Sequence, residues 1–232
     1  PSKGEMDEEF HLEHIGTGLM QTGELSVLEA NKEVTKFGII TTRLFNMIPE
    51  LLKETDVKKF NNLMARIRKY EDITDRMEVE IADYLAKASQ GEMSDSASIK
   101  VRSMISIIND MERIGDICYQ LSITIERKRE QKAYFTPELR TSLEVMISEV
   151  QKAMVIMNKN LNSSYSQVLI ADADEAELAI NKMRNQLRKK YLQNIEKGEG
   201  KIQTGMIYNN LIHSLEKVGD HVFNISEAIT GK

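Results

Sequence analysis

Two short acidic motifs contain the residues of this chain that are best suited to chemistry. One reads Glu-Arg-Ile-Gly-Asp from Glu112 to Asp116, and the other reads Glu-Lys-Val-Gly-Asp from Glu216 to Asp220. The second copy follows the first by 104 residues, which is almost half of the 232-residue chain. Residues three and four apart share one face of a helix, so each motif places two carboxylates on adjacent turns.

Carboxylates on adjacent turns repel each other unless a cation or a raised pKa compensates. Oxygen ligands suit cations such as iron, manganese, magnesium and calcium, and they tolerate zinc. Each motif continues along its helix as a polar column. The columns are Asn109, Glu112, Asp116 and Gln120, and His213, Glu216, Asp220, Asn224 and Glu227. A metal-binding face is therefore one interpretation, and a solvated acidic face beside Lys and Arg is the other.

The elements that must position these motifs are helices. Apolar residues recur every three or four positions, prolines are few, and no segment reads as a strand. We expect helices at 22–53, 56–91, 94–129, 136–161, 172–195 and 202–229. Pro49 is expected to kink or break the first near Met47 or Ile48.

Several residues are typical of helix ends. The predicted N-terminal caps are Thr55 or Asp56, Ser94, Thr136 before Pro137, and Asp172 in a capping box with Glu175. Gly91 and Gly231 are expected to end the second and sixth helices, and the break before the sixth falls at Gly198–Gly200. Leu25, Leu28 and Leu178 belong to the predicted apolar stripes.

The motif offset predicts a repeated three-helix unit. Glu71 and Asp75 on the second helix align with Glu177 and Asn181 on the fifth at an offset of 106, close to the motif offset. We therefore expect an all-α fold of two tandem three-helix repeats. The boundaries are a tail at 1–20, a first repeat at 21–132 and a second repeat at 133–232. Gly115 and Gly219 at equivalent places indicate close approach of helices, or room for a bulky group.

The composition excludes several classes of protein function. The net charge of −5 gives no nucleic-acid footprint, and no apolar run is long enough to span a bilayer. Cys118 is the single cysteine, so neither an intrachain disulfide nor a thiolate site is expected. His11 and His14 are assigned to a solvated tail. The basic run Arg127–Arg129 is assigned to a favourable helix end.

Motifs of catalysis are missing from the sequence. It has no glycine-rich phosphate loop, no His-Glu-x-x-His and no nucleophile elbow. A di-iron carboxylate enzyme would need Glu-x-x-His pairs on core helices, whereas Glu8 to His11 in the tail is the single pair of this kind. We therefore expect a protein that is not an enzyme, and no direct small-molecule substrate is evident from the sequence.

The two motifs, the second followed by His221 and by Asn224–Ile225, resemble the signature motifs of the PhoU family. The resemblance covers about residues 26–229. It implies two three-helix repeats and a role in phosphate uptake and its regulation. It also implies a bound metal ion or cluster, with iron or zinc as the expected metal.

Matching the family pattern by position gives the expected metal ligands. They are Glu112, Asp116, Glu216, Asp220, Glu71, Asp75 and Glu177. The second repeat departs from the pattern, because Asn181 replaces an expected Asp and Arg184 stands where the first repeat has Glu78. An amide adds no charge and an arginine repels a cation, so we expect the two halves to bind metal unequally.

Two contexts follow from the resemblance. The favoured one is a regulatory domain at the C-terminus of a sodium/phosphate cotransporter, on the cytoplasmic face of the inner membrane, with the transmembrane region in the same chain. The start at Pro1 without Met and the stretch 14–34 favour it. The alternative is a free-standing adaptor that contacts a sensor kinase and a transporter ATPase. Homo-oligomerisation, a metal-free structural bundle and a di-iron enzyme are further hypotheses.

Overall fold

The computed structural model describes residues 12, 15, 23–163, 168, 170–196 and 201–231, without the side chains of 194 and 195. The described chain forms six helices and contains no strand. They are α1 (Gly23–Lys53), α2 (Val57–Ala88), α3 (Asp95–Glu130), α4 (Pro137–Leu161), α5 (Ala171–Glu196) and α6 (Ile202–Thr230). Three fall in each predicted repeat, and the all-α prediction is confirmed.

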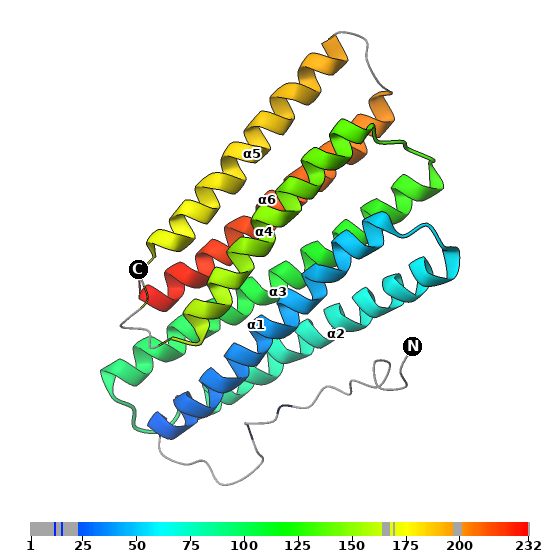
Figure 1. Ribbon diagram of the computed structural model, residues 1–232. Coiled ribbons are helices and arrows are strands. Elements are labelled where there is room, and N and C mark those ends of the chain that lie inside the picture. The colour runs from blue at the N-terminus through cyan, green and yellow to red at the C-terminus, as the bar shows by residue number, and fades with distance from the viewer. Residues whose placement is uncertain are drawn as a thin grey trace.

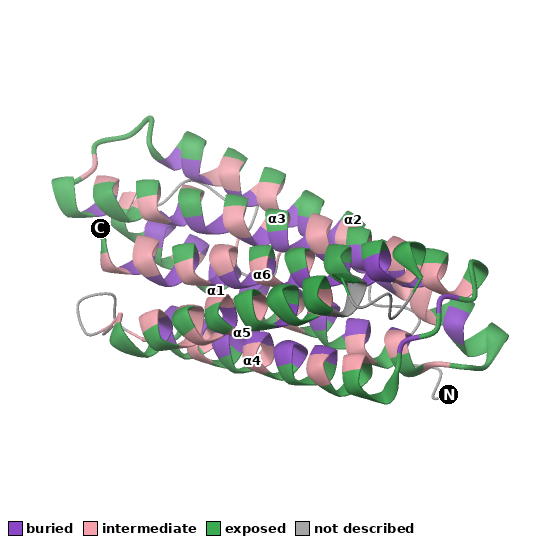
Figure 2. Ribbon diagram, turned by 90° about the horizontal axis from the view of Figure 1, so that it is seen from above, coloured by how far each residue is buried: buried purple, intermediate pink, exposed green. Residues whose placement is uncertain are grey.

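The helices lie side by side as one elongated bundle (Figure 1). α2 and α5 lie at opposite edges, and α3 packs against α6 while α1 packs against α4. The two three-helix units are therefore joined along their third and first helices. Figure 2 shows that buried residues face the interior of this bundle along its whole length.

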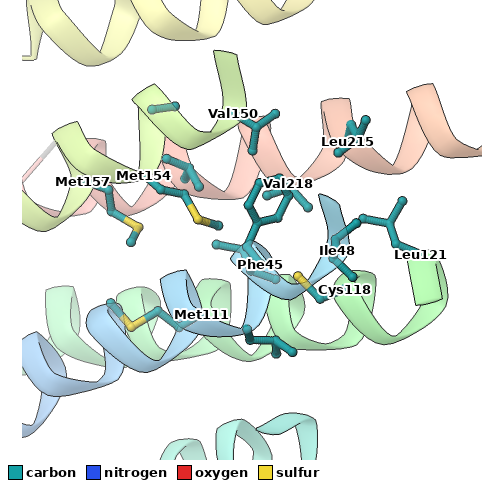
Figure 3. Packing of buried hydrophobic residues seen from close by; sticks show 14 of the residues in the cluster. Phe45, Ile48, Met111, Cys118, Leu121, Val150, Met154, Met157, Leu215 and Val218 are labelled. Atoms are coloured by element: carbon teal, nitrogen blue, oxygen red, sulfur yellow. The ribbon is translucent and has the colours of Figure 1, made fainter. Parts of the chain in front are cut away.

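Both units contribute to one apolar core (Figure 3). Phe45 of α1, Cys118 of α3 and Val218 of α6 are fully buried and lie close to one another in that view. Cys118 is thus a core residue, as its sequence context predicts. Methionines from both units, including Met111 and Met154, fill the space between the helices, which suits their flexible side chains.

Three predicted N-terminal caps are confirmed. Asp56 accepts a hydrogen bond from the Lys59 amide at 2.9 Å, and Ser94 accepts one from the Ala97 amide at 3.2 Å. Thr136 accepts one from the Leu139 amide at 3.3 Å, directly before Pro137. These bonds satisfy amides that the first turn of a helix leaves without a partner.

Helix ends differ from the sequence prediction at three places. Pro49 does not break α1, because the buried Ile48 and Leu51 hold the last turn and the helix continues to Lys53. α2 ends at Ala88 rather than near Gly91, with Ser89 as its C-terminal cap. Asp172 lies inside the first turn of α5 rather than before it, and the Ala173 amide donates to the Ile170 carbonyl.

Three residues assigned to apolar stripes are exposed. Leu25 and Leu28 on α1 face away from the core, and Leu178 on α5 is 66% exposed. α5 lies at an edge of the bundle, so a narrow stripe of it is covered. That stripe is Ala173, Ile180 and Leu187, seven residues apart. The tail histidines and Gly198–Gly200 lie outside the described residues.

Candidate metal site on the first repeat

Close contact between α2 and α3 brings the acidic residues of the first repeat together. A Cβ atom placed on Gly115 would lie 2.3 Å from Thr74 Oγ1, so no larger residue fits there without movement. In the second repeat, a Cβ on Gly219 would lie 2.9 Å from Ile180 Cδ1. Thr74 and Ile180 occupy equivalent positions on α2 and α5. The motif glycines therefore permit close helix approach, as one of the two sequence interpretations predicts.

Three carboxylates converge beside the Gly115 contact. Ligand atoms of Glu71 and Asp75 on α2 and of Asp116 on α3 all lie within 4.8 Å of one another. Glu71 and Asp116 are half-buried, and Asp75 is exposed. Glu112, one turn before Asp116, belongs to the same cluster electrostatically, because its pKa responds to both Asp116 and Asp75. The structure thus brings three of the four candidate ligands of the first repeat together, and the fourth, Glu112, interacts with them electrostatically.

The charges of this cluster are costly to hold together. Burial and the neighbouring Asp116 carboxylate together raise the pKa of Glu112 to about 7, although Arg113 acts to lower it. Burial also raises the pKa of Glu71 and that of Asp75, with neighbouring carboxylates adding to both effects. A raised carboxyl pKa means that the folded protein disfavours the charged form. A bound cation would reverse that preference.

Two arginines act electrostatically on this cluster: Arg68 lowers the pKa of Glu71, and Arg113 lowers that of Glu112. Arg113 is the basic residue of the motif, but its side chain is 64% exposed. Its nitrogen atoms approach Glu112 at 3.7 Å and Asp116 at 3.8 Å, which are loose contacts that water screens. Four carboxylates on two closely packed helices match the oxygen ligands that hard and borderline cations prefer. The first repeat therefore fits a metal ion.

The second repeat is organised differently. Arg184 on α5 donates to Glu216 on α6, with 2.8 Å between Nη2 and Oε1. Asn181 donates to Glu177 at 3.2 Å, so this amide turns toward a carboxylate of its own helix. Among the described residues, three carboxylates converge in the first repeat and not in the second.

Asp220 shares the second-repeat surface with Glu216 and Glu177. Burial raises its pKa, Glu216 and Glu177 add to the effect, and His221 and Arg184 oppose it. His213 also approaches Glu216, with 3.2 Å between Nδ1 and Oε2. Glu216 is thus already engaged by two basic side chains, whereas the corresponding Glu112 has the loose Arg113 contact.

The structure also reveals a polar contact between the repeats. His221 Nδ1 on α6 lies 2.7 Å from Asp110 Oδ1 on α3, and Asn224 Nδ2 lies 3.4 Å from the same oxygen. Both residues stand beside the motifs in the sequence. Their pairing could not be inferred from helical periodicity, because it depends on how one repeat packs on the other.

The remaining members of the polar columns do not join a cluster of carboxylates. Asn109, Gln120 and His213 are exposed. At the basic end of α3, Arg129 donates to the backbone carbonyls of Glu54 and Thr55. Lys128 lies over the Phe135 ring. These contacts agree with the structural role expected for the basic run. No described helix has the length and apolar character needed to cross a bilayer.

Comparison with known proteins relates this architecture to one family. Residues 34–124 match the family model described as PhoU domain, and this range includes α2 and the first acidic motif. Over 218 residues the chain is 24% identical to the phosphate-specific transport system accessory protein PhoU homolog 1 of Thermotoga maritima. That match covers 87% of this chain and 89% of the relative.

Solved structures share the fold. The phosphate transport system regulatory protein PhoU from Streptococcus pneumoniae has a TM-score of 0.74 at 17% identity, covering 90% of this chain and 95% of that one. PhoU from Pseudomonas aeruginosa has a TM-score of 0.75 at 16% identity, covering 89% and 96%. The six-helix bundle with paired acidic motifs is therefore a PhoU-like fold. Residues 34–124 match the PhoU domain, and the chain resembles PhoU proteins over most of its length.

Proposed function

We propose that this protein is a non-enzymatic regulator of phosphate transport of the PhoU type. The observation that carries the proposal is the family match over the first repeat, which includes the acidic motif at Glu112 to Asp116. The relative from Thermotoga maritima is described as an accessory protein of a phosphate-specific transport system. Its similarity extends across most of both chains, which supports the same kind of role here.

We further propose that the first repeat binds a metal ion through Glu71, Asp75, Glu112 and Asp116. Support comes from the convergence of three of these side chains and from the raised carboxyl pKa values. The metal would lower the cost of placing like charges where α2 and α3 meet. Its role would then be to hold the two helices together and to fix the surface that they present.

The free-standing adaptor is the context that we favour. A relative described as an accessory protein matches across nearly its whole length, and so do the solved PhoU structures. A sodium/phosphate cotransporter that carries this domain on the cytoplasmic face of the inner membrane stays a prediction. So do a homo-oligomer and an interaction with a transmembrane transporter region. Reading the genomic frame around the coding sequence separates these contexts.

The regulatory role can be tested by complementation. In a bacterial strain that lacks its own PhoU gene, expression of this chain should restore the control of phosphate uptake, measured with radiolabelled phosphate. The matched control is the variant Glu112→Ala with Asp116→Ala at the same expression level. Uptake that does not differ between the strain with the chain and the strain without it would contradict the proposed role.

Metal binding has its own test. Protein purified without chelator or affinity tag is analysed for iron, zinc and manganese, and each metal is then added to chelated protein while thermal unfolding is followed. A ligand that binds the folded state raises the unfolding temperature by mass action. Absence of both retained metal and stabilisation would favour the metal-free structural bundle. Oxygen consumption with ferrous iron would instead favour the di-iron enzyme.

A further inference from the structure

The second acidic motif is paired with an arginine side chain from the neighbouring helix. Arg184 Nη2 lies 2.8 Å from Glu216 Oε1, and the Glu216 side chain is 12% exposed. Glu216 is the equivalent of Glu112, which has a proposed metal role in the first repeat. A carboxylate this well shielded from water needs a counter-charge, and hydrogen bonds to a guanidinium supply one.

Two substitutions distinguish α5 from α2 where they face the motifs. Asp75 of α2 corresponds to Asn181 of α5, and Glu78 corresponds to Arg184. The first change removes one negative charge, and the second replaces a negative charge with a positive one. The second repeat is therefore three charges more positive at these two positions than the first. A divalent cation would meet both a smaller negative charge and a guanidinium that already occupies Glu216.

The side-chain geometry agrees with this charge difference. Asn181 donates to Glu177 at 3.2 Å, so the carboxylate of α5 that matches Glu71 is already engaged. Glu216 is held by Arg184 across the helix contact and approached by His213 from its own helix. Two of the three predicted ligands of the second repeat thus have partners within the protein. The residues present in this repeat do not fit the metal that the family resemblance implies.

We infer that Arg184 takes the place of a metal ion in the second repeat, so that α5 and α6 are held together by a guanidinium–carboxylate pair and this repeat folds without metal. The inference deepens the proposed function, because it assigns metal binding to one half of the molecule. Any metal-dependent regulation then acts through α2 and α3. α5 and α6 form a half whose structure does not depend on metal supply.

The first test measures how much the Arg184–Glu216 pair stabilises the metal-free protein. With chelator present, Arg184→Ala should lower the thermal unfolding temperature by several degrees, because Glu216 is left shielded from water without its counter-charge. Arg184→Gln should show a smaller loss. The control is Lys182→Ala, an exposed lysine on the same helix. An unfolding temperature for Arg184→Ala that equals that of the control would overturn the inference. This result does not depend on whether the first repeat binds metal.

The second test introduces into α5 the two acidic residues that α2 has at the equivalent positions. The double variant Asn181→Asp with Arg184→Glu should take up added manganese or zinc beyond the unmodified protein, roughly doubling the metal content measured by elemental analysis. Its unfolding temperature in chelator should fall and should recover when the metal is added. Circular dichroism in the presence of metal checks that the variant is folded. A folded variant with unchanged metal content would overturn the inference, even if the unmodified protein retains no metal.

Discussion

His221 Nδ1 on α6 lies 2.7 Å from Asp110 Oδ1 on α3, which makes this pair a direct polar link between the two repeats. Both side chains are largely buried, at 26% and 15% exposed. An ionised carboxylate can only accept a hydrogen bond, so the proton of this link belongs to His221 Nδ1. The equivalent positions in the other repeat are Ser214 and Ile117. The repeats are therefore joined by a polar contact that the sequence symmetry does not duplicate.

Removal of this link should weaken the association of the two repeats. Asp110→Ala and His221→Ala should each lower the free energy of unfolding, because each leaves a partly buried polar partner behind. The two losses should not add, and a coupling energy of about 0.5–3 kcal/mol is expected for groups in direct contact. Urea unfolding of the four proteins of the double-mutant cycle measures it. Additive losses would mean that the contact contributes nothing of its own.

The glycine of the first motif should tolerate substitution less well than that of the second. Gly115→Ala places a methyl group 2.3 Å from Thr74 Oγ1, whereas Gly219→Ala meets the end of the Ile180 side chain at 2.9 Å. Overpacking of this kind costs about 1–3 kcal/mol, against a gain of about 1 kcal/mol in helix propensity from replacing glycine. We expect Gly115→Ala to destabilise the protein and Gly219→Ala to be close to neutral.

Chemical unfolding of both glycine variants checks this difference. Thr74→Ala combined with Gly115→Ala provides the control, because it removes the hydroxyl that the new methyl group would meet. The double variant should recover part of the stability lost by Gly115→Ala. If Gly115→Ala and Gly219→Ala are equally stable, the contact with Thr74 does not set the distance between α2 and α3.

Most helix positions could be predicted from the sequence because apolar periodicity and cap residues are local signals. Ser94 and Thr136 begin helices as expected, and Gly231 ends α6 with a φ of 73°. The capping box at Asp172 was wrong, because an acid three residues before a glutamate occurs equally well inside a first turn. Leu178 was misassigned, because periodicity does not show how much of a helix at the edge of a bundle is covered.

The candidate metal-site residues could be predicted in part, because the motif and the repeat offset can be read from the sequence alone. Position in the motif identified Glu112 and Asp116, and the repeat offset added Glu71 and Asp75 from the preceding helix. The sequence also showed that Arg184 stands at a departure from the pattern. It could not show that Arg184 reaches Glu216, or that His221 meets Asp110. Both contacts join different helices, so they depend on the packing of the bundle.

Metal content should depend unequally on the two motifs. Glu112→Ala with Asp116→Ala removes two of the four carboxylates of the first-repeat cluster, and we expect it to abolish most of the bound metal. Glu216→Ala with Asp220→Ala removes residues that already face Arg184 and should leave the metal content almost unchanged. Elemental analysis of matched preparations gives the comparison. Equal losses would show that the two halves share the metal equally.

The acidic cluster should make the metal-free protein less stable as the pH rises. In the folded protein the pKa of Glu112 is about 7, compared with its usual value of 4.5. Between these two values the folded state holds more protons on this residue than the unfolded state does. Linkage then requires the free energy of unfolding to increase as the pH falls through about 7 and to level off near 4.5. The raised pKa values of Glu71 and Asp75 act in the same direction.

Glu112→Gln tests this pH dependence, because the amide has a similar shape and cannot ionise. In chelator, the variant should be more stable than the unmodified protein above pH 7, and its stability should change less between pH 7 and 4.5. Urea unfolding across this range measures both effects, with Glu126→Gln on the same helix but outside the cluster as the control. Because a metal would bind the ionised carboxylates, its affinity should rise with pH over the same interval. Parallel stability profiles for Glu112→Gln and the unmodified protein would contradict the raised pKa and the charge repulsion from which the metal site is argued.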